Sequence, residues 1–115
     1  MIFIIEDDLT FASCLKKYCK GEQVNIFSNI IDAVNALDDE LPSLIFLDVL
    51  LAGPDGFTLL NELASYPDTA KIPIVIVSSL NFAGKDLSAY GVVGTLNKET
   101  LTPKEIQSYV ELYSH

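Results

Sequence analysis

Polar side chains that could do chemistry stand at the ends of short apolar runs in this sequence. They are Glu6, Asp7 and Asp8 after IFII (2–5), Asp48 after LIFL (44–47), Ser78 and Ser79 after IVIV (74–77), and Lys98 after VVGTL (92–96). Asp48 is the single carboxylate within the apolar stretch from Leu44 to Leu51. A buried carboxylate without compensation costs several kcal/mol or gives up its charge, so a partner for Asp48 is expected elsewhere in the chain.

The apolar runs, together with VNIF at 24–27, are predicted β-strands. Most are nearly continuous in apolar character, which is typical of parallel strands covered on both faces. Five helical patterns lie between or after the predicted strands. The first ends at Gly21 and has Phe11, Leu15, Tyr18 and Cys19 on one face, and the second is capped by Ser28 and has Ile30, Ile31, Val34 and Leu37 on one face. A third extends over 57–66, a fourth and weaker one over 81–90, and the fifth begins with a capping box at Thr102–Glu105 and has Ile106, Tyr109, Val110 and Tyr113 on one face. The alternation predicts one flavodoxin-like α/β domain over residues 1–115, with a doubly wound parallel sheet of order 2-1-3-4-5 and five helices.

This topology predicts where the polar side chains meet. Ligands of open parallel sheets bind beyond the carboxyl ends of the strands, and the first and third strands are neighbours in the 2-1-3-4-5 order. Asp7 and Asp48 should therefore lie side by side and repel each other unless a cation lies between them. Mg²⁺ is suited to such oxygen ligands. With Lys98 as a further cation, Asp48 could accept a phosphoryl group as a nucleophile.

Composition limits the other functions open to the chain. Sixteen acidic residues face seven lysines, for a net charge of −9, so direct binding to nucleic acid or to anionic membranes is not expected. No apolar stretch approaches the ~18 to 20 residues of a membrane span, and the start does not read as a secretory signal. Cys14 and Cys19, five residues apart in one predicted helix, are interpreted as reduced packing residues. A cytoplasmic location is the default expectation.

The sequence resembles the receiver domains of response regulators, the phospho-accepting half of two-component signalling. The resemblance rests on IIEDD (4–8), LDVLLAGPDGF (47–57), PIVIVSS (73–79) and LNK (96–98), and it extends over essentially the whole chain. It implies that Asp48 takes the phosphoryl group and that Asp7 is a direct metal ligand, with Glu6 acting mainly through water. It also implies a ligand carbonyl at Leu50, a switch hydroxyl at Ser78, a phosphate-binding N–H at Ser79 and a phosphate-binding ammonium at Lys98. Asp8 is interpreted as a helix cap.

Partners also follow from the resemblance. A histidine kinase or phosphotransfer protein would donate the phosphoryl group, and the surface of the fourth helix, fifth strand and fifth helix would signal to an effector domain, an effector protein or a second copy. The chain would be an acceptor with at most self-phosphorylation and self-dephosphorylation activity. Thr95 departs from the family, which usually has Tyr or Phe there. The alternative is therefore a receiver-like interaction module that signals without phosphate.

A phosphohydrolase and a flavin-binding module are less consistent with these residues. A phosphohydrolase with an aspartyl intermediate would need a second acid two residues after the nucleophile, where this chain has Leu50. A flavin-binding module would need a Gly- and hydroxyl-rich loop after the first strand, where this chain has EDDLT.

Overall fold

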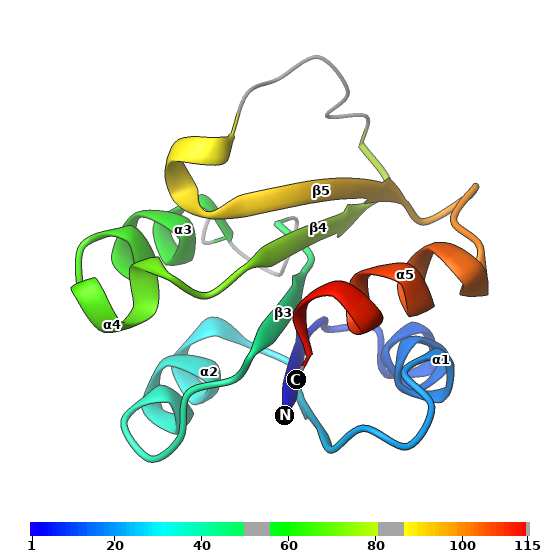
Figure 1. Cartoon of the computed structure of the whole chain (residues 1–115), viewed down its shortest axis with the longest axis horizontal. Coiled ribbons are helices and arrows are strands. Elements are labelled where there is room, and N and C mark those ends of the chain that lie inside the picture. Colours follow the sequence, from blue (N-terminus) through cyan, green and yellow to red (C-terminus); the bar gives the residue numbers. More distant parts are fainter. Residues whose placement is uncertain (50–55, 81–86, 115) are drawn as a thin grey trace.

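The computed structural model describes residues 1–49, 56–80 and 87–114 of the chain (Figure 1). The strands are β1 (Ile2–Ile5), β2 (Val24–Phe27), β3 (Leu44–Leu47), β4 (Ile74–Ser78) and β5 (Val92–Asn97). The helices of the described residues are α1 (Leu9–Tyr18), α2 (Ile30–Leu37), α3 (Gly56–Ala64), α4 (Pro67–Ala70) and α5 (Pro103–Tyr113), with a 3₁₀ helix η1 (Ser88–Tyr90) before β5.

The five strands form one parallel sheet in the order β2-β1-β3-β4-β5, as the sequence predicts. The first three strands begin and end at the predicted residues, and β4 and β5 each run one residue further than predicted. In the pairing of β1 with β3, Ile5 lies opposite Leu47, so the residues that follow these two strands leave the sheet side by side. Because the strands are parallel, the predicted site residues that follow them lie at one edge of the sheet, the edge where the strands end.

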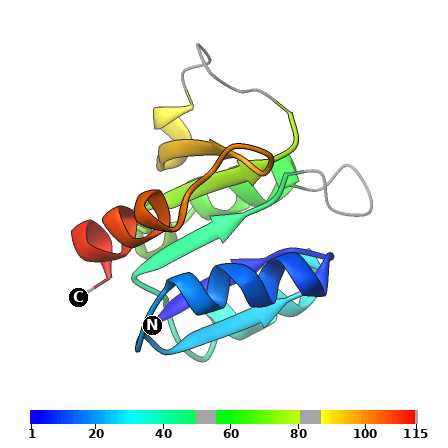
Figure 2. The same cartoon turned by 90° about the vertical axis from the view of Figure 1, so that its right-hand side faces the viewer.

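Helices cover both faces of the sheet, and the sheet separates the core into two layers. In β1, Ile2 and Ile4 pack on the side of α1 and α5, while Phe3 and Ile5 pack on the side of α2 and α3. The same alternation holds in β3 and β4, where side chains on both faces are buried. Figure 2 views the molecule from the side on which α1 and α5 lie over the sheet. Burial on both faces explains why these strands read as continuous apolar runs.

Two predicted helix boundaries are wrong by a few residues. The first helix ends at Tyr18 with Cys19 as its C-cap, and the chain then turns through positive φ at Lys20 (23°) and Gly21 (76°). Gly21 therefore belongs to the turn and is not the cap. The cap of α2 is Asn29 and not Ser28, because the Asn29 side chain accepts a hydrogen bond from the Asp32 N–H at 2.8 Å.

The helical regions around the third and fourth predicted helices also differ from the expectation. A short helix, α4, follows α3 where the sequence indicated only an end, and it starts with Pro67 at its first position, which suits the fixed φ of proline. Of the helix expected over 81–90, residues 81–86 lie outside the described residues, and the rest holds η1. Ile31 was expected on the buried face of α2 but is 72% exposed, and Ala33 takes the buried position.

The last helix has the predicted start and the predicted buried face. The Thr102 hydroxyl accepts from the Glu105 N–H at 3.2 Å, and the Glu105 carboxylate accepts from the Thr102 N–H at 3.0 Å, which completes the capping box. Ile106 and Val110 are buried against the sheet, and Tyr109 and Tyr113 pack beside them. Within 1–49, 56–80 and 87–114, no helix has the length and apolar character that spanning a bilayer requires.

The two cysteines are free, and they differ in environment. Cys19 is fully buried, and burial, with a smaller effect of the Glu22 charge, raises the pKa of its thiol from 9.0 to about 11. Because the folded pKa is raised, the stability that comes from keeping this thiol neutral is complete below about pH 9 and is lost as the pH rises towards 11.

We therefore expect the two thiols to react at different rates. With an aromatic disulfide reagent at pH 8, partly exposed Cys14 should react first, and Cys19 should react only as fast as the chain opens, because the thiolate is the reactive form. Denaturant should make the two thiols equivalent, and Cys14→Ser should remove the fast phase. Equal rates in the native protein would contradict the closed packing of Cys19.

Candidate functional site

The candidate site lies where β1 and β3 end at the carboxyl edge of the sheet. Glu6 and Asp7 directly follow β1, and Asp48 directly follows β3. Backbone hydrogen bonds hold these residues in register: the Asp48 N–H donates to the Ile5 carbonyl at 3.0 Å, and the Glu6 N–H donates to the Phe27 carbonyl at 2.9 Å. The acidic side chains are therefore positioned by the rigid core of the sheet.

The carboxylates of Glu6, Asp7 and Asp48, hereafter the acidic cluster, converge at this edge. Each offers an oxygen, and these oxygens all lie within 4.8 Å of one another. Glu6 is 2% exposed and Asp48 is 5% exposed, whereas Asp7 is exposed. The predicted juxtaposition of Asp7 and Asp48 is confirmed. The cluster thus has two buried carboxylates and one that faces solvent.

Lys98, just beyond β5, supplies positive charge to the buried part of the acidic cluster. Its ammonium nitrogen lies 2.9 Å from the Asp48 Oδ2 and also forms an ion pair with the Glu6 carboxylate. The same nitrogen lies 4.9 Å from the centre of the Phe11 ring on α1, within the range of a cation–π contact. Its backbone N–H donates to the Ser78 carbonyl at 3.0 Å, which places Lys98 beside the end of β4.

The charges within the site shift two pKa values. Burial raises the pKa of Glu6 above 4.5, and the Asp48 charge adds to this, although Lys98 and the Asp8 N–H act in the opposite direction. Burial alone would lower the pKa of Lys98, but its bonds to Glu6 and Asp48 outweigh that effect and raise it above 10.5. Lys98 is therefore firmly cationic at neutral pH.

Asp8 acts as the cap of α1, as predicted. Its carboxylate accepts from the N–H groups of Thr10 and Phe11, both at 3.1 Å. Its own N–H donates to the Glu6 Oε2 at 3.1 Å and so fixes the Glu6 side chain. A helix cap and a charged site residue are thus joined by one hydrogen bond.

The remaining predicted site residues fall in different environments. Ser78 is fully buried at the end of β4, and its hydroxyl oxygen accepts from the Leu80 N–H at 3.2 Å. Ser79 is exposed at the same edge. Leu50 lies outside the described residues. Thr95 lies within β5, half-buried, in place of the aromatic residue usual in the resembled family.

Two features of the site were not expected from the sequence. Glu6 shares Lys98 with Asp48, where the expectation was a residue acting mainly through water. Phe11 was expected only as a core residue of α1, yet its ring also contacts the Lys98 ammonium. The role of Glu6 could have been predicted from the sequence, because Glu6 directly extends a strand that is buried on both faces. No signal in the sequence distinguished Phe11 from the other apolar residues of its helix.

The donor atoms of the acidic cluster fit a hard divalent cation. All three side chains are carboxylates, which are ligands that Mg²⁺ prefers. Among the residues that the structure describes, three negative charges meet the positive charge of Lys98, so the cluster would remain repulsive without a further cation. Because Asp7 is exposed, a cation that keeps several of its waters can enter from the solvent side.

Comparisons with known proteins agree with this fold. The family model of the response regulator receiver domain matches residues 2–111. The chain therefore belongs to the response regulator receiver domain family of two-component signalling.

Two curated relatives show the range of similarity. The chain is 42% identical over 45 residues to response regulator PleD of Caulobacter vibrioides, which covers 39% of this chain and 10% of PleD. It is 25% identical over 114 residues to the probable transcriptional regulator ycf29 of Porphyra purpurea, which covers 96% of this chain and 54% of that protein. The chain thus spans about a tenth to about half the length of these relatives.

Solved structures match nearly the whole chain. A putative response regulator from Chloroflexus aurantiacus is 28% identical, with a TM-score of 0.80, over 96% of this chain and 93% of that one. The signal receiver domain of a signal transduction histidine kinase from Syntrophus aciditrophicus is also 28% identical, with a TM-score of 0.80, over 96% of this chain and 86% of that one. Receiver folds of this kind therefore occur in regulators and in kinases alike.

Proposed function

We propose that this receiver domain accepts a phosphoryl group on Asp48 in a reaction that requires Mg²⁺. The observation that carries the proposal is the acidic cluster at the carboxyl edge of the sheet, with Lys98 paired to Asp48. Asp48 directly follows a buried strand, lies next to Lys98 and belongs to a group of carboxylates that could hold a cation. This is the arrangement that a carboxylate nucleophile needs.

The transfer can be written from the groups present. A carboxylate oxygen of Asp48 attacks the phosphorus of a phosphohistidine in line with the bond that breaks. The new bond joins the Asp48 oxygen to phosphorus, and the phosphorus–nitrogen bond breaks with its electron pair going to the donor imidazole. Bound Mg²⁺ would offset the negative charge of the phosphoryl oxygens.

Each remaining residue has a proposed task. Lys98 would leave the Asp48 oxygen and pair with a phosphoryl oxygen, while Phe11 and Glu6 keep its ammonium at the edge of the sheet. The Ser78 hydroxyl and the Ser79 N–H would bind further phosphoryl oxygens, and the Leu50 carbonyl would join Asp7 and Asp48 as a metal ligand. Movement of Ser78 would pull on β4 and alter the neighbouring surface of η1, β5 and α5.

The partners follow from this role. A histidine kinase or phosphotransfer protein would donate, and an effector domain, effector protein or second copy would read the surface of η1, β5 and α5. We propose no enzyme activity beyond self-phosphorylation and self-dephosphorylation. The free Cys14 and Cys19 are consistent with the cytoplasmic location that we propose for this reaction.

Beryllofluoride, a phosphoryl mimic, tests the proposal against its alternative. With Mg²⁺ present, amide resonances at Asp48, Ser78, Ser79 and Lys98 should shift together, and Asp48→Asn should abolish the shifts while Asp39→Asn, an exposed acid away from the site, should not. The alternative, an interaction module that signals without phosphate, has Thr95 in its favour. It predicts no shift at Asp48 in the wild type, and that result would refute phosphoryl acceptance.

A further inference from the structure

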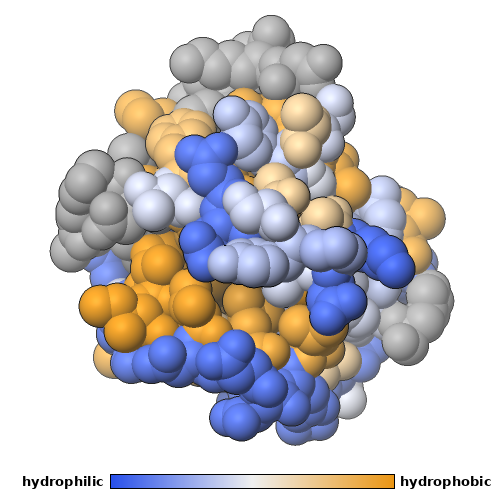
Figure 3. All heavy atoms as spheres, turned by 90° about the vertical axis from the view of Figure 1, so that its left-hand side faces the viewer, coloured by the Kyte–Doolittle hydropathy of each residue, from blue (hydrophilic) through white to orange (hydrophobic). Residues whose placement is uncertain are grey.

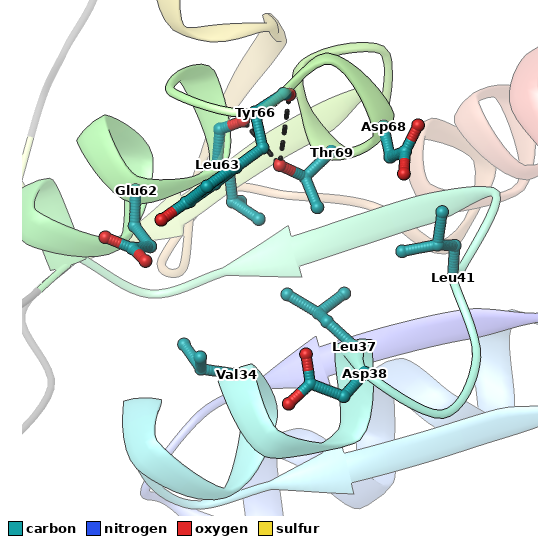
Figure 4. Close-up of a pocket in the computed structure, with 9 residues that line it drawn as sticks. All are labelled: Val34, Leu37, Asp38, Leu41, Glu62, Leu63, Tyr66, Asp68 and Thr69. Atoms are coloured by element: carbon teal, nitrogen blue, oxygen red, sulfur yellow. Dashed lines mark hydrogen bonds between the residues drawn. The ribbon is translucent and has the colours of Figure 1, made fainter.

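A concave surface lies on the side of the molecule formed by α2, α3 and α4. It is a groove of about 420 Å³, and Figure 4 shows Val34 and Leu37 of α2 on one side of it and Leu63 and Tyr66 on the other. Leu41, from the loop before β3, closes one end. Figure 3, which faces this side, shows a hydrophobic patch bordered by hydrophilic residues.

Two large apolar side chains of the groove are partly exposed. Tyr66 is 56% exposed and Leu41 is 45% exposed, while Leu63 beneath them is buried. The wall is held in place, because the Thr69 hydroxyl donates to the Leu63 carbonyl at 2.6 Å and also bonds to the Tyr66 carbonyl. A preformed apolar groove with a fixed wall loses little conformational freedom on binding.

Acidic residues line the rim of the groove, and no basic residue does so within the part of the chain that the structure describes. The charged side chains that line it are Asp38, Glu62 and Asp68, all of them exposed. An apolar floor with an anionic rim is complementary to an amphipathic helix that carries Lys or Arg beside its apolar stripe.

The same charges disfavour other occupants. A second copy docked through this groove would place Asp38, Glu62 and Asp68 against the same acids of its partner, since a two-fold contact is self-complementary. An anionic lipid surface would be repelled by the same rim. The charge pattern therefore favours a basic protein segment over either of these.

We propose that this groove binds a basic amphipathic helix of a partner protein. The groove lies at the end of the sheet opposite to the acidic cluster, because Leu37, Asp38 and Leu63 stand at the C-terminal ends of helices that run antiparallel to the strands. A partner can therefore be held there without covering the edge of the sheet that carries the acidic cluster. Binding at this groove does not require phosphoryl acceptance by Asp48.

Model peptides on the full chain test the proposal. The probe is a helical peptide of leucine and lysine, about 18 residues or five turns long, with the leucines on one face. Its controls are a peptide with glutamate in place of lysine and a peptide of scrambled order. The expected result is saturable binding of the first peptide alone, with amide shifts that cluster at Leu41, Leu63 and Tyr66 in the wild type and equally in Asp48→Asn.

Variants separate groove binding from general attraction to an acidic protein. Leu41→Ser with Tyr66→Ser, both at exposed positions, should weaken binding about tenfold or more, since these are two of the large apolar side chains that line the groove. Asp38→Asn with Glu62→Gln should weaken it several-fold. The matched pair Glu99→Gln with Glu111→Gln, exposed and outside the groove, should leave it unchanged.

Several results would overturn the proposal. They are equal losses in the two charge variants, shifts centred outside the groove, equal binding of the glutamate peptide, or a dimer in the free protein that the Leu41 and Tyr66 substitutions dissolve. Thermal unfolding of each variant confirms that the fold persists before its binding is interpreted.

Discussion

Replacing Lys98 with Met is expected to lower the free energy of unfolding by about 3 kcal/mol at neutral pH in the absence of divalent cations. The substitution leaves the carboxylates of Glu6 and Asp48, which are 2% and 5% exposed, without the ammonium that pairs with both of them. The Met side chain fills a similar volume beside Phe11, so the cost is electrostatic and not a packing defect.

Denaturant unfolding measures this effect against two controls. Lys104→Met removes an exposed lysine from α5 and should change stability by no more than about 0.5 kcal/mol. Adding Glu6→Gln to Lys98→Met removes one of the two uncompensated charges and should recover a large part of the loss. A Lys98→Met protein as stable as the wild type would show that the ion pairs do not compensate the buried acids.

The pH dependence of the same variant has a defined sign. The pKa of Glu6 is already raised by burial, and loss of Lys98 raises it further. A raised folded-state pKa means that stability is present below the unfolded value of 4.5 and is lost as the pH rises through the folded value. The loss of stability in Lys98→Met should therefore be largest at neutral pH and should shrink as the pH falls through the raised pKa of Glu6 towards the unfolded value of 4.5.

Replacing Asp48 with Asn is expected to abolish phosphoryl acceptance while changing stability by only about 1 kcal/mol, the typical effect of a single substitution. An amide is not a nucleophile towards phosphorus, so transfer should fall to the background of a chain with no acceptor. The fold should persist because Lys98 keeps Glu6 as its partner, and the repulsion between Asp48 and the other two acids is relieved. Removing the Lys98 charge is therefore costly for stability, and removing the Asp48 charge is not.

Incubation with a small acyl phosphate and Mg²⁺, followed by intact mass measurement, checks the transfer. The wild type should gain the mass of one phosphoryl group, and Asp48→Asn should gain none. Asp68→Asn, an exposed acid on α4, serves as the matched control and should be phosphorylated as the wild type is. Phosphoryl uptake by Asp48→Asn at the rate of the wild type would place the acceptor at another residue.

The sequence predicts the sheet and its functional edge well because both depend on strong local patterns. Strands buried on both faces read as continuous apolar runs, so β1 and β3 are bounded correctly and the positions of Asp7 and Asp48 follow from the strand order. The capping box at Thr102 and the Asp8 cap are similarly local, since each satisfies backbone groups a few residues away.

Features that depend on tertiary contacts are predicted less well. The four-residue helix α4 is too short to show a helical period, and so the groove that it lines could not be expected from the sequence. The choice between Ser28 and Asn29 as the cap of α2 depends on a side-chain hydrogen bond. The sharing of Lys98 between Glu6 and Asp48 depends on the distance between three strand ends, which composition and spacing do not encode.

A titration of ¹⁵N-labelled protein with Mn²⁺ tests most directly whether the acidic cluster holds one divalent cation. The paramagnetic ion broadens resonances near its binding site. We expect saturation at one ion per chain, with the earliest broadening at Glu6, Asp7 and Asp48, competition by Mg²⁺, and loss of the effect in Asp7→Asn. Broadening spread evenly over the acidic surface, or centred away from these three residues, would contradict this expectation.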